Sequence, residues 1–277
     1  MSGTLYVVST PIGNLGDVSH RAIEVLSSVA AVLAEDTRHS RRLLDAYEVR
    51  TPMLAYHEHN EARMTPALVE RLRGGESFAL ISDAGTPLLS DPGARLIASA
   101  IDAGVAVSAV PGASALLAAL VTAGLDATRF TFYGFLARKG RERGEVIDAL
   151  VGARHTCVLY EAPGRVADTL AELAAAGAAE RPAAVARELT KTYEEVRRGT
   201  VGALAAYYAE QAPRGEVVIV LGGGATRQVA DDATVRARAA ELRMAGATAR
   251  DVGRALVAEF GIGRNEAYRI AQSEDST

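Results

Sequence analysis

Charged and polar side chains gather in one short stretch of the sequence, Glu35-Asp36-Thr37-Arg38-His39, directly after an apolar run. The carboxylates of Glu35 and Asp36 can accept a proton from a hydroxyl group. The guanidinium group of Arg38 can bind phosphate oxygens through parallel hydrogen bonds. The stretch therefore holds the groups that a phosphate-and-ribose site needs. The alternative interpretation is a helix start with local ion pairs.

A second polar stretch, His57-Glu58-His59-Asn60, follows the next short apolar run. In an extended chain, the side chains of His57 and His59 lie on the same face. Two histidines are too few for a closed zinc site, and Cys157 is the only cysteine that could add a thiolate. We therefore expect no metal site. The stretch either forms hydrogen bonds with a substrate or lies in a solvated loop.

Residues 82–93, Ser-Asp-Ala-Gly-Thr-Pro-Leu-Leu-Ser-Asp-Pro-Gly, separate an apolar run from a helical stretch. Ligands bind at the carboxyl ends of strands in α/β sheets, and small residues allow the backbone to approach them closely. A simple connection needs only about two to six residues. We expect Asp91 to cap the following helix, with Pro92 at its first position. The loop predicts a ligand site.

Two further loops have a similar composition: Thr10-Pro11-Ile12-Gly13-Asn14-Leu15-Gly16-Asp17 and Pro111-Gly112-Ala113-Ser114-Ala115. The first has a Gly-x-x-Gly spacing, and Glu35 and Asp36 follow about twenty residues later, as in dinucleotide sites. That fingerprint needs a third glycine, and Pro11 stands in its place. The dinucleotide interpretation is therefore incomplete.

A repeated strand–loop–helix pattern must position these residues. In the first half of the chain it predicts strands at 4–9, 29–33, 53–56, 76–81 and 105–110, and helices at 18–27, around 43–47, and at 67–72, 94–103 and 115–121. Such alternation is typical of a mostly parallel sheet with helices on its faces. The carboxyl ends of the strands, with their loops, would then meet at one edge.

The second half of the chain predicts another α/β domain and a helical tail. Strands are expected at 130–135, 155–160, 183–187, 195–199 and 216–221, and tail helices at 235–244, 249–260 and 264–271. Turns at 245–246 and 261–263 separate the tail helices, which is a helix-turn-helix pattern. The predicted fold is α/β, with mostly parallel or mixed sheets. Its domains are 1–123, 124–224 and 231–277, with glycines 222–224 as a hinge.

Composition narrows the class of protein. The chain has 277 residues and 49% hydrophobic content, enough for two domains with cores. Its net charge of −4 gives no overall basic field, so any contact with RNA must be a local patch. The strongest basic run is Arg138-Lys139-Gly140-Arg141-Glu142-Arg143, which would contact phosphates or lie in a solvated loop. Without a leader or a membrane-length apolar run, we expect a cytoplasmic protein and no membrane contact.

Taken together, these motifs resemble a known family. They run in the family's order over nearly the whole chain: residues 9–17, Ala34-Glu35-Asp36-Thr37-Arg38, His57-Glu58-His59-Asn60, residues 82–93, residues 110–115, Tyr160-Glu161-Ala162-Pro163-Gly164-Arg165, Arg187-Glu188-Leu189-Thr190-Lys191 and residues 215–219. The chain resembles the tetrapyrrole methylase-like (class III) methyltransferases that use S-adenosylmethionine. Within them it is similar to the branch that methylates the ribose 2′-hydroxyl of a cytidine in bacterial 16S ribosomal RNA.

The resemblance implies that S-adenosylmethionine binds in a cleft between the two α/β domains. The cofactor-binding residues it implies are Leu15, Ala84, Gly85, Thr86, Leu89, Ser114, Ala115, Tyr160, Leu189 and Gly215. It also implies a homodimer and a tail that helps to bind 16S rRNA or the surface of the small ribosomal subunit.

For catalysis, we expect Glu35 or Asp36 to remove the hydroxyl proton, and Arg38 and His59 to orient ribose or phosphate. There are two alternative functions. A methylase of a tetrapyrrole (corrin or porphyrin) precursor would not account for the Glu-Asp-Thr-Arg motif or the helical tail. A non-enzymatic RNA-binding factor would not need intact cofactor loops.

Overall fold

The computed structural model describes residues 2–224, 232–260 and 264–272. The chain divides into two compact units, Met1–Gly223 and Gly224–Thr277. The first unit holds two α/β domains, each built on a five-stranded sheet, and the second holds three helices. The predicted fold class is therefore confirmed. No helix in the described ranges is long and apolar enough to cross a membrane.

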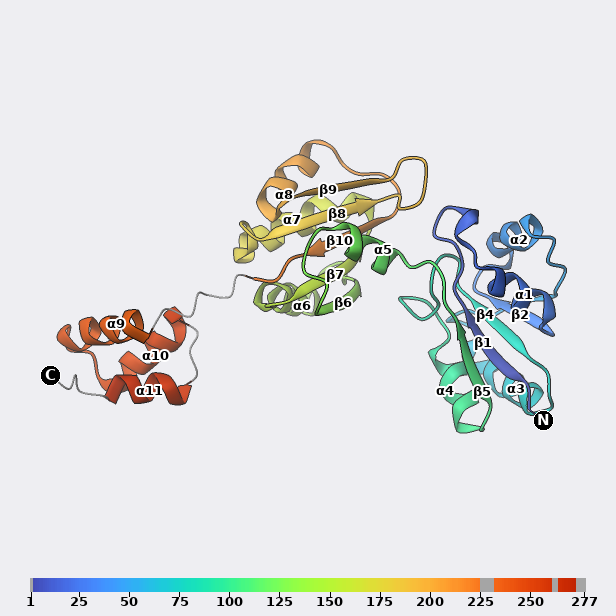
Figure 1. Cartoon of the computed structure of the whole chain (residues 1–277), viewed down its shortest axis with the longest axis horizontal. Helices are drawn as coiled ribbons and strands as arrows, with labels where there is room; N and C mark the ends of the chain where they lie inside the picture. Colours follow the sequence, from blue (N-terminus) through green and yellow to red (C-terminus); the bar gives the residue numbers. More distant parts are fainter. Residues whose placement is uncertain (1, 225–231, 261–263, 273–277) are drawn as a thin grey trace. The chain divides into compact units, whose positions relative to one another are not determined.

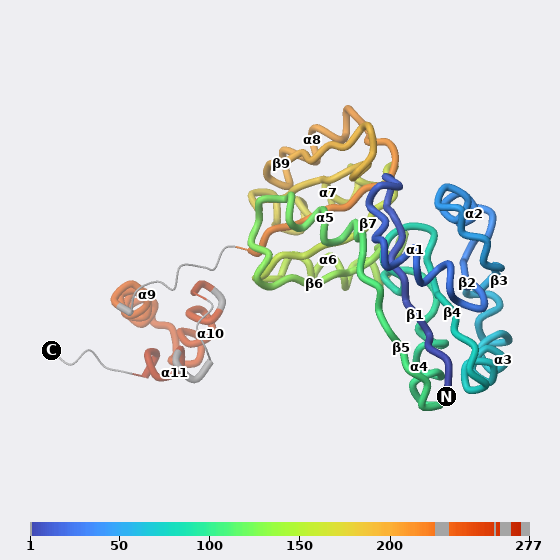
Figure 2. Tube along the Cα trace, turned by 45° about the vertical axis from the view of Figure 1, so that its right-hand side comes forward, coloured from blue at the N-terminus to red at the C-terminus, as the bar shows by residue number. Residues whose placement is uncertain are grey.

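The first sheet is entirely parallel, with the strand order β3-β2-β4-β1-β5. Its strands are β1 (Thr4–Val8), β2 (Ala31–Ala34), β3 (Met53–Ala55), β4 (Phe78–Ile81) and β5 (Ala106–Val110). Its helices are α1 (His20–Ser28), α2 (Thr37–Ala46), α3 (Glu61–Arg73) and α4 (Ala94–Asp102). Figures 1 and 2 show the helices around this sheet from two directions. All the strand ends that carry the polar motifs lie at one edge.

Alternating side chains of the strands build a core on each face of this sheet. Leu33 and Leu80 pack with residues of α3 and α4, whereas Val32 and Ala79 pack with residues of α1 and α2. Every residue of β2 and β4 is buried because both strands are central and covered on both faces. The continuous apolar runs in the sequence follow from that double coverage.

The second sheet is mixed, with the order β6-β7-β10-β8-β9. Its strands are β6 (Phe130–Phe135), β7 (Thr156–Glu161), β8 (Pro182–Arg187), β9 (Glu195–Thr200) and β10 (Val217–Leu221). Strands β6 and β7 are parallel, and the other pairs are antiparallel. The helices α6 (Arg141–Gly152), α7 (Val166–Leu173) and α8 (Val201–Glu210) contribute to the core on one face, whereas α5 (Ala115–Thr122) packs on the other.

The second unit consists of α9 (Asp232–Met244), α10 (Ala249–Phe260) and α11 (Arg264–Gln272). Its core includes Val235, Val252, Leu256 and Ile270. The Thr248 hydroxyl caps α10 by accepting a hydrogen bond from the Asp251 N–H at 3.2 Å. The predicted turn at 261–263 lies outside the described residues, and the helix-turn-helix assignment stays a prediction.

Candidate active site

Hydrogen bonds join the three glycine-bearing loops of the first sheet. Thr10 and Gly85 exchange two backbone hydrogen bonds of 2.8 and 3.1 Å. The Thr86 hydroxyl donates to the Ala113 carbonyl at 3.1 Å and lies 3.0 Å from the Ser9 hydroxyl. Because a hydroxyl has one proton, Ser9 must donate to Thr86. The loops after β1, β4 and β5 therefore form one connected platform.

A cavity of about 380 Å³ lies on this platform and is closed by residues of the second domain. This volume is in the range of small-molecule sites. Most of the predicted cofactor residues line it: Ala84, Gly85, Thr86, Leu89, Ala115, Tyr160, Leu189 and Gly215. The sequence did not indicate that other residues also line this cavity, among them Ile12, Asp83, Asp91, Phe135, Glu161 and Glu216.

Two predicted cofactor residues lie outside this lining. Ser114 is the N-cap of α5, and its hydroxyl accepts a hydrogen bond from the Leu117 N–H at 3.5 Å. Leu15 lines a second, smaller cavity. The first loop reaches the main cavity through Ile12 instead. The sequence contains one indication that Ile12 reaches the main cavity, because Ile12 is the apolar loop residue nearest the end of β1.

Strained backbone borders the main cavity on two sides. Leu88 and Ser90 have φ values of 76°, and Glu188 and Thr190 have φ values of 49° and 65°. Side chains rarely adopt this left-handed conformation, which is concentrated at functional sites. Gly215 has a φ of 82°, and a Cβ atom there would lie 2.0 Å from Oε1 of Glu188. Only glycine fits that position without a rearrangement.

Carboxyl groups cluster where the cavity meets the end of β2. Burial, together with the negative charges of Glu35 and Asp83, raises the pKa of Asp91 to about 6. Burial and the charge of Asp83 also raise the pKa of Glu35. The Asp36 N–H donates to Oδ1 of Asp83 at 3.2 Å. The cluster therefore holds carboxyl groups suited to proton transfer near neutral pH.

The prediction that Asp91 caps α4 is wrong. The N-cap is Gly93, which has a φ of 130° and forms no side-chain cap. The helix begins only at Ala94, and so Pro92 is not its first residue. Asp91 lines the cavity instead.

Asp36 is the N-cap residue of α2. Its Oδ1 accepts hydrogen bonds from the N–H groups of Arg38 and His39 at 2.8 and 3.4 Å. The Arg38 N–H bond is the largest cause that lowers the pKa of Asp36. The Arg38 side chain is 92% exposed and pairs with Asp36 at 3.5 Å. Glu35, and not Asp36, therefore has the environment of a proton acceptor.

The His57-Glu58-His59-Asn60 stretch forms a turn after β3. Asn60 holds the turn, because its Oδ1 accepts from the His57 N–H and its Nδ2 donates to the Ala55 carbonyl, both at 2.9 Å. The rings of His57 and His59 meet edge to face at 6.0 Å. The charge of His57 also acts on Glu35. The turn therefore brings His59 to the sheet edge that carries Glu35. Within the described ranges, no His, Cys, Asp or Glu side chains form a group of three that could hold a metal ion.

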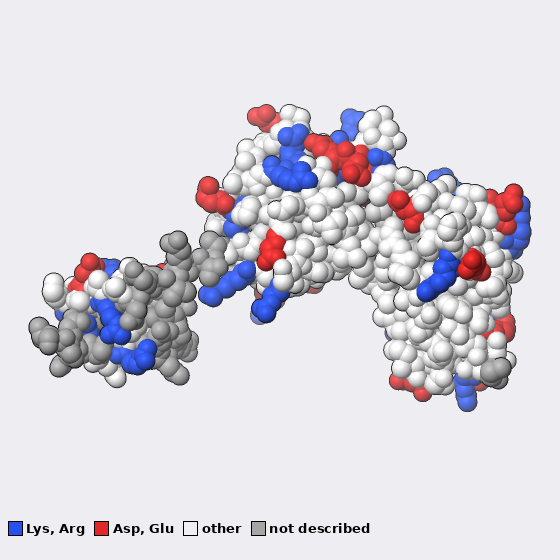
Figure 3. All heavy atoms as spheres, viewed as in Figure 1, with Lys and Arg blue, Asp and Glu red and all other residues white. Residues whose placement is uncertain are grey.

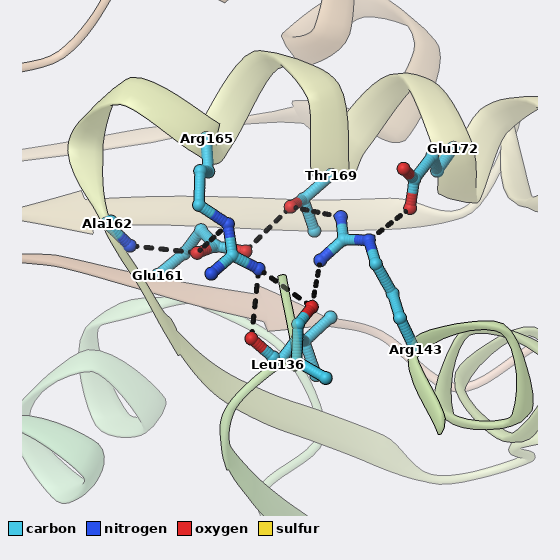
Figure 4. A network of polar contacts seen from close by, with 8 residues as sticks. Leu136, Arg143, Glu161, Ala162, Arg165, Thr169 and Glu172 are labelled. Carbon is cyan, nitrogen blue, oxygen red and sulfur yellow. Dashed lines mark hydrogen bonds and ion pairs between the residues drawn. The ribbon is translucent and has the colours of Figure 1, made fainter. Parts of the chain in front are cut away.

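A buried polar network supports the second-domain wall of the cavity (Figure 4). The carboxylate of Glu161 accepts from the Thr169 hydroxyl at 2.7 Å and pairs with Arg165 at 3.2 Å. Arg143 donates to the Thr169 hydroxyl at 2.9 Å and to the Ala137 carbonyl at 3.1 Å. Arg143 therefore fits neither alternative expected for the basic run, phosphate contact or a solvated loop, because it is buried and internally bonded.

Charged side chains of both signs share the surface of the molecule (Figure 3). On the face shown in Figure 3, Lys and Arg side chains stand in separate groups among Asp and Glu. An RNA strand would have to use local groups such as Arg38 in the first turn of α2.

The family model of tetrapyrrole (corrin/porphyrin) methylases matches residues 4–205. The chain belongs to this family. Within it, the chain is similar to the ribosomal RNA small subunit methyltransferase I of Synechocystis sp., with 41% identity over 97% of each chain. It is also similar to proteins of the same name from Mesorhizobium japonicum (50% identity, covering 79% of this chain and 74% of the relative) and Bacillus subtilis (39% identity, covering 96% and 93%).

Solved structures with the same fold are more distant in sequence. A diphthine synthase has a TM-score of 0.62 and 16% identity, covering 80% of this chain and 90% of that one. The uroporphyrin-III C-methyltransferase of Thermus thermophilus in complex with S-adenyl homocysteine has a TM-score of 0.58 and 20% identity, covering 79% and 97%. At these low sequence identities, the structural similarity shows a shared fold and nothing further.

Proposed function

We propose that this chain transfers a methyl group from S-adenosylmethionine to the ribose 2′-hydroxyl of a cytidine in 16S ribosomal RNA of the small ribosomal subunit. The observation that carries the proposal is similarity over nearly the full chain to a ribosomal RNA small subunit methyltransferase I. The three-loop cavity supports it, because it offers a preformed small-molecule site at the strand ends.

The residues that line the main cavity fit S-adenosylmethionine. This cofactor supplies an electrophilic methyl group on a positively charged sulfur. Apolar side chains such as Ile12, Leu89 and Val218 provide surface for an adenosine moiety, and the carboxylates of Asp83 and Asp91 favour a cation. Gly85, with a φ of 82°, keeps the backbone open to a ligand. We propose that the predicted cofactor residues that line this cavity hold it.

The chemistry requires that a ribose hydroxyl lose its proton as it attacks. A carboxyl group with a raised pKa can accept that proton near neutral pH. Glu35 and Asp91 both have raised pKa values, and the charge of Glu35 contributes to the raised pKa of Asp91, so we treat the two carboxyl groups as one cluster that shares a proton. We propose that Glu35, together with Asp91, accepts the proton of the ribose hydroxyl. Arg38 and His59, both exposed at the same edge, orient ribose or phosphate.

Partners and location follow from the same proposal. The substrate is 16S rRNA in the small ribosomal subunit, and the protein acts in the cytoplasm, where ribosomes are assembled. We also propose a homodimer. Leu117 and Val121 of α5 are 50% and 73% exposed, and α5 is a helix on the less covered face of the second sheet. No bound metal is expected to take part.

A methyl-transfer assay tests the proposal. Small ribosomal subunits from a strain that lacks the modification would be incubated with the protein and tritiated S-adenosylmethionine. We expect label in the RNA and none in a uroporphyrinogen control. Label in the tetrapyrrole alone would replace the proposal with the wider family's chemistry.

Single substitutions then test the assigned residues. Glu35→Gln is expected to slow single-turnover methylation by about two orders of magnitude, because it removes a proton acceptor. Asp36→Asn is expected to have a smaller effect, because asparagine also caps helices well. A normal rate for Glu35→Gln with intact folding would remove Glu35 from the mechanism.

A further inference from the structure

A second cavity, of about 300 Å³, adjoins the main one. The first loop, α2 and the start of the second loop form its walls. It is lined by Thr10, Pro11, Gly13, Leu15, His39, Ser40, Arg42, Leu43, Ser82 and Asp83. Asp83 also lines the main cavity, so the two cavities meet at this carboxylate. A ligand in the second cavity would lie next to the cofactor site.

Hydrogen bonds hold the walls of the second cavity in place. The Tyr47 hydroxyl donates to the Leu15 carbonyl at 2.6 Å, which ties the first loop to the end of α2. The Thr10 hydroxyl donates to the Ser82 carbonyl at 3.2 Å and joins the first loop to the second. The Asp36 N–H holds the Asp83 carboxylate. The cavity is therefore built into the fold before any ligand binds.

Ser40 indicates that this cavity takes a polar ligand. The residue is 3% exposed, and in the described part of the chain its hydroxyl has no hydrogen-bond partner. Buried polar groups nearly always have a partner, because leaving one unsatisfied costs free energy. Ser40 lines the cavity, so a ligand bound there can supply the missing partner.

Arg42 and Asp83 define the chemistry of that ligand. A guanidinium group binds phosphate oxygens well, and a carboxylate accepts hydrogen bonds from sugar hydroxyls. A nucleotide carries both groups. Enzymes that act on one nucleotide of a folded RNA commonly take it out of its stack into a pocket.

We propose that the second cavity receives the acceptor nucleotide of the RNA. Arg42 binds its phosphate, the Ser40 hydroxyl bonds to its polar edge, and Asp83 lies beside the ribose at the junction with the main cavity. This inference rests on the proposed function and adds to it the place where the substrate binds.

Two neighbouring arginines of α2 provide a matched test. Both are exposed, but only Arg42 lines the cavity. Arg42→Ala is expected to raise the KM for small subunits about tenfold, the effect of losing one charged hydrogen bond. Its affinity for S-adenosylhomocysteine, measured by calorimetry, should stay within about twofold. Arg41→Ala makes the same charge change outside the cavity and should leave both quantities near the wild-type values.

Ser40→Ala tests the unpartnered hydroxyl. We expect a severalfold higher KM with no loss of thermal stability, because a hydroxyl without a partner does not stabilise the free protein. A structural role would instead lower the melting temperature and leave KM unchanged. That result would overturn the role of Ser40.

Two outcomes with an active wild-type enzyme would overturn the assignment of the cavity. One is an equal rise in KM for Arg41→Ala and Arg42→Ala, which would indicate diffuse attraction to RNA. The other is an equal loss of S-adenosylhomocysteine and RNA binding in Arg42→Ala, which would make the cavity part of the cofactor site. Failure of the wild-type protein to methylate small subunits would instead overturn the proposed function.

Discussion

Asp91 is half-buried beside the main cavity, and burial together with the charges of Glu35 and Asp83 raises its pKa to about 6. A carboxyl group with this pKa is mostly ionised at pH 7.5 and is also a stronger base than an ordinary aspartate. Its ionised form is poorly solvated, so the native fold bears a cost at neutral pH. Such a cost is common where function requires it.

The raised pKa predicts how Asp91→Asn changes stability with pH. Between about pH 4 and pH 6 the native state binds more protons at Asp91 than the unfolded state, so unfolding free energy falls as pH rises through this window. The substitution Asp91→Asn removes the titrating group, so the variant does not lose unfolding free energy in this way as the pH rises. We expect the variant to be more stable than wild type by about 1–2 kcal/mol at pH 7.5, after allowance for partial exposure, and by much less at pH 4. Urea denaturation at the two pH values measures this.

The rate of RNA methylation by Asp91→Asn shows whether Asp91 takes part in proton transfer. If it shares the proton of the cluster, Asp91→Asn should methylate RNA about a hundredfold more slowly while being more stable at pH 7.5. A variant that is destabilised equally at pH 4 and pH 7.5 would contradict the pKa argument. An unchanged rate would leave Glu35 as the proton acceptor.

Single residues were the hardest part of the site to predict from the sequence. The sequence indicates that residues 82–93 approach a ligand, but not which carboxylate faces it. A helix that begins at Ala94 instead of Pro92 moves Asp91 from a capping role to the cavity. Likewise, the path of the first loop places Ile12 and not Leu15 in the main cavity. These outcomes depend on φ values that no spacing rule specifies.

At the scale of the elements, the network around Arg143 fixes the loop after β6 against α7. Arg143 is buried, whereas Arg141 in the same basic run has a side chain that is 93% exposed. Arg143→Met is expected to lower the free energy of unfolding by about 1–3 kcal/mol, because Thr169 and Ala137 lose a charged donor. Arg141→Met, the matched control, should change it by less than about 0.5 kcal/mol. Equal effects in denaturation experiments would contradict the buried network.

The three-loop platform makes a second prediction at this scale. Ser9→Ala removes the hydrogen bond to Thr86 without touching the cavity lining. We expect about 1 kcal/mol of lost stability and about fivefold weaker binding of S-adenosylhomocysteine, because Thr86 is held less firmly. Ser27→Ala on the exposed surface of α1 is the control. Unchanged affinity in Ser9→Ala would show that the platform holds without this bond.

The elements themselves were largely predictable. Strand β6 and helix α10 have the predicted bounds, and most other strands differ by a residue or two. Short apolar runs bounded by glycine and proline carry this information. The helix predicted at 67–72 is longer, because α3 begins at Glu61 and tolerates Pro66 inside it. Proline usually marks a helix boundary, and tertiary packing of Leu68 and Leu72 outweighs it here.

At the scale of the whole molecule, the helical unit after Gly223 has its own core and can be removed without cutting either sheet. A protein ending at Gly224 is expected to bind S-adenosylhomocysteine within about twofold of the full chain, and small subunits about tenfold more weakly. Calorimetry and filter binding measure the two affinities. A larger loss of cofactor binding than of subunit binding would contradict an RNA-binding role for this unit.

The features of the whole molecule that could not be predicted from the sequence depend on contacts between residues that are far apart in the chain. The order β3-β2-β4-β1-β5 places the ends of β1 and β4 side by side, and that adjacency creates both cavities. The packing of α5 on the second sheet depends on residues distant in sequence, such as Val158 and Val218. No local pattern encodes these contacts. The resemblance to a family, and not periodicity, indicated the cofactor.

The most direct test of the account is to find the product nucleoside. Small subunits methylated by the protein would be digested to nucleosides and analysed by mass spectrometry. We expect 2′-O-methylcytidine that depends on S-adenosylmethionine and that forms about a hundredfold more slowly with Glu35→Gln. A methyl group on a base, or no methylated nucleoside with active cofactor binding, would contradict it.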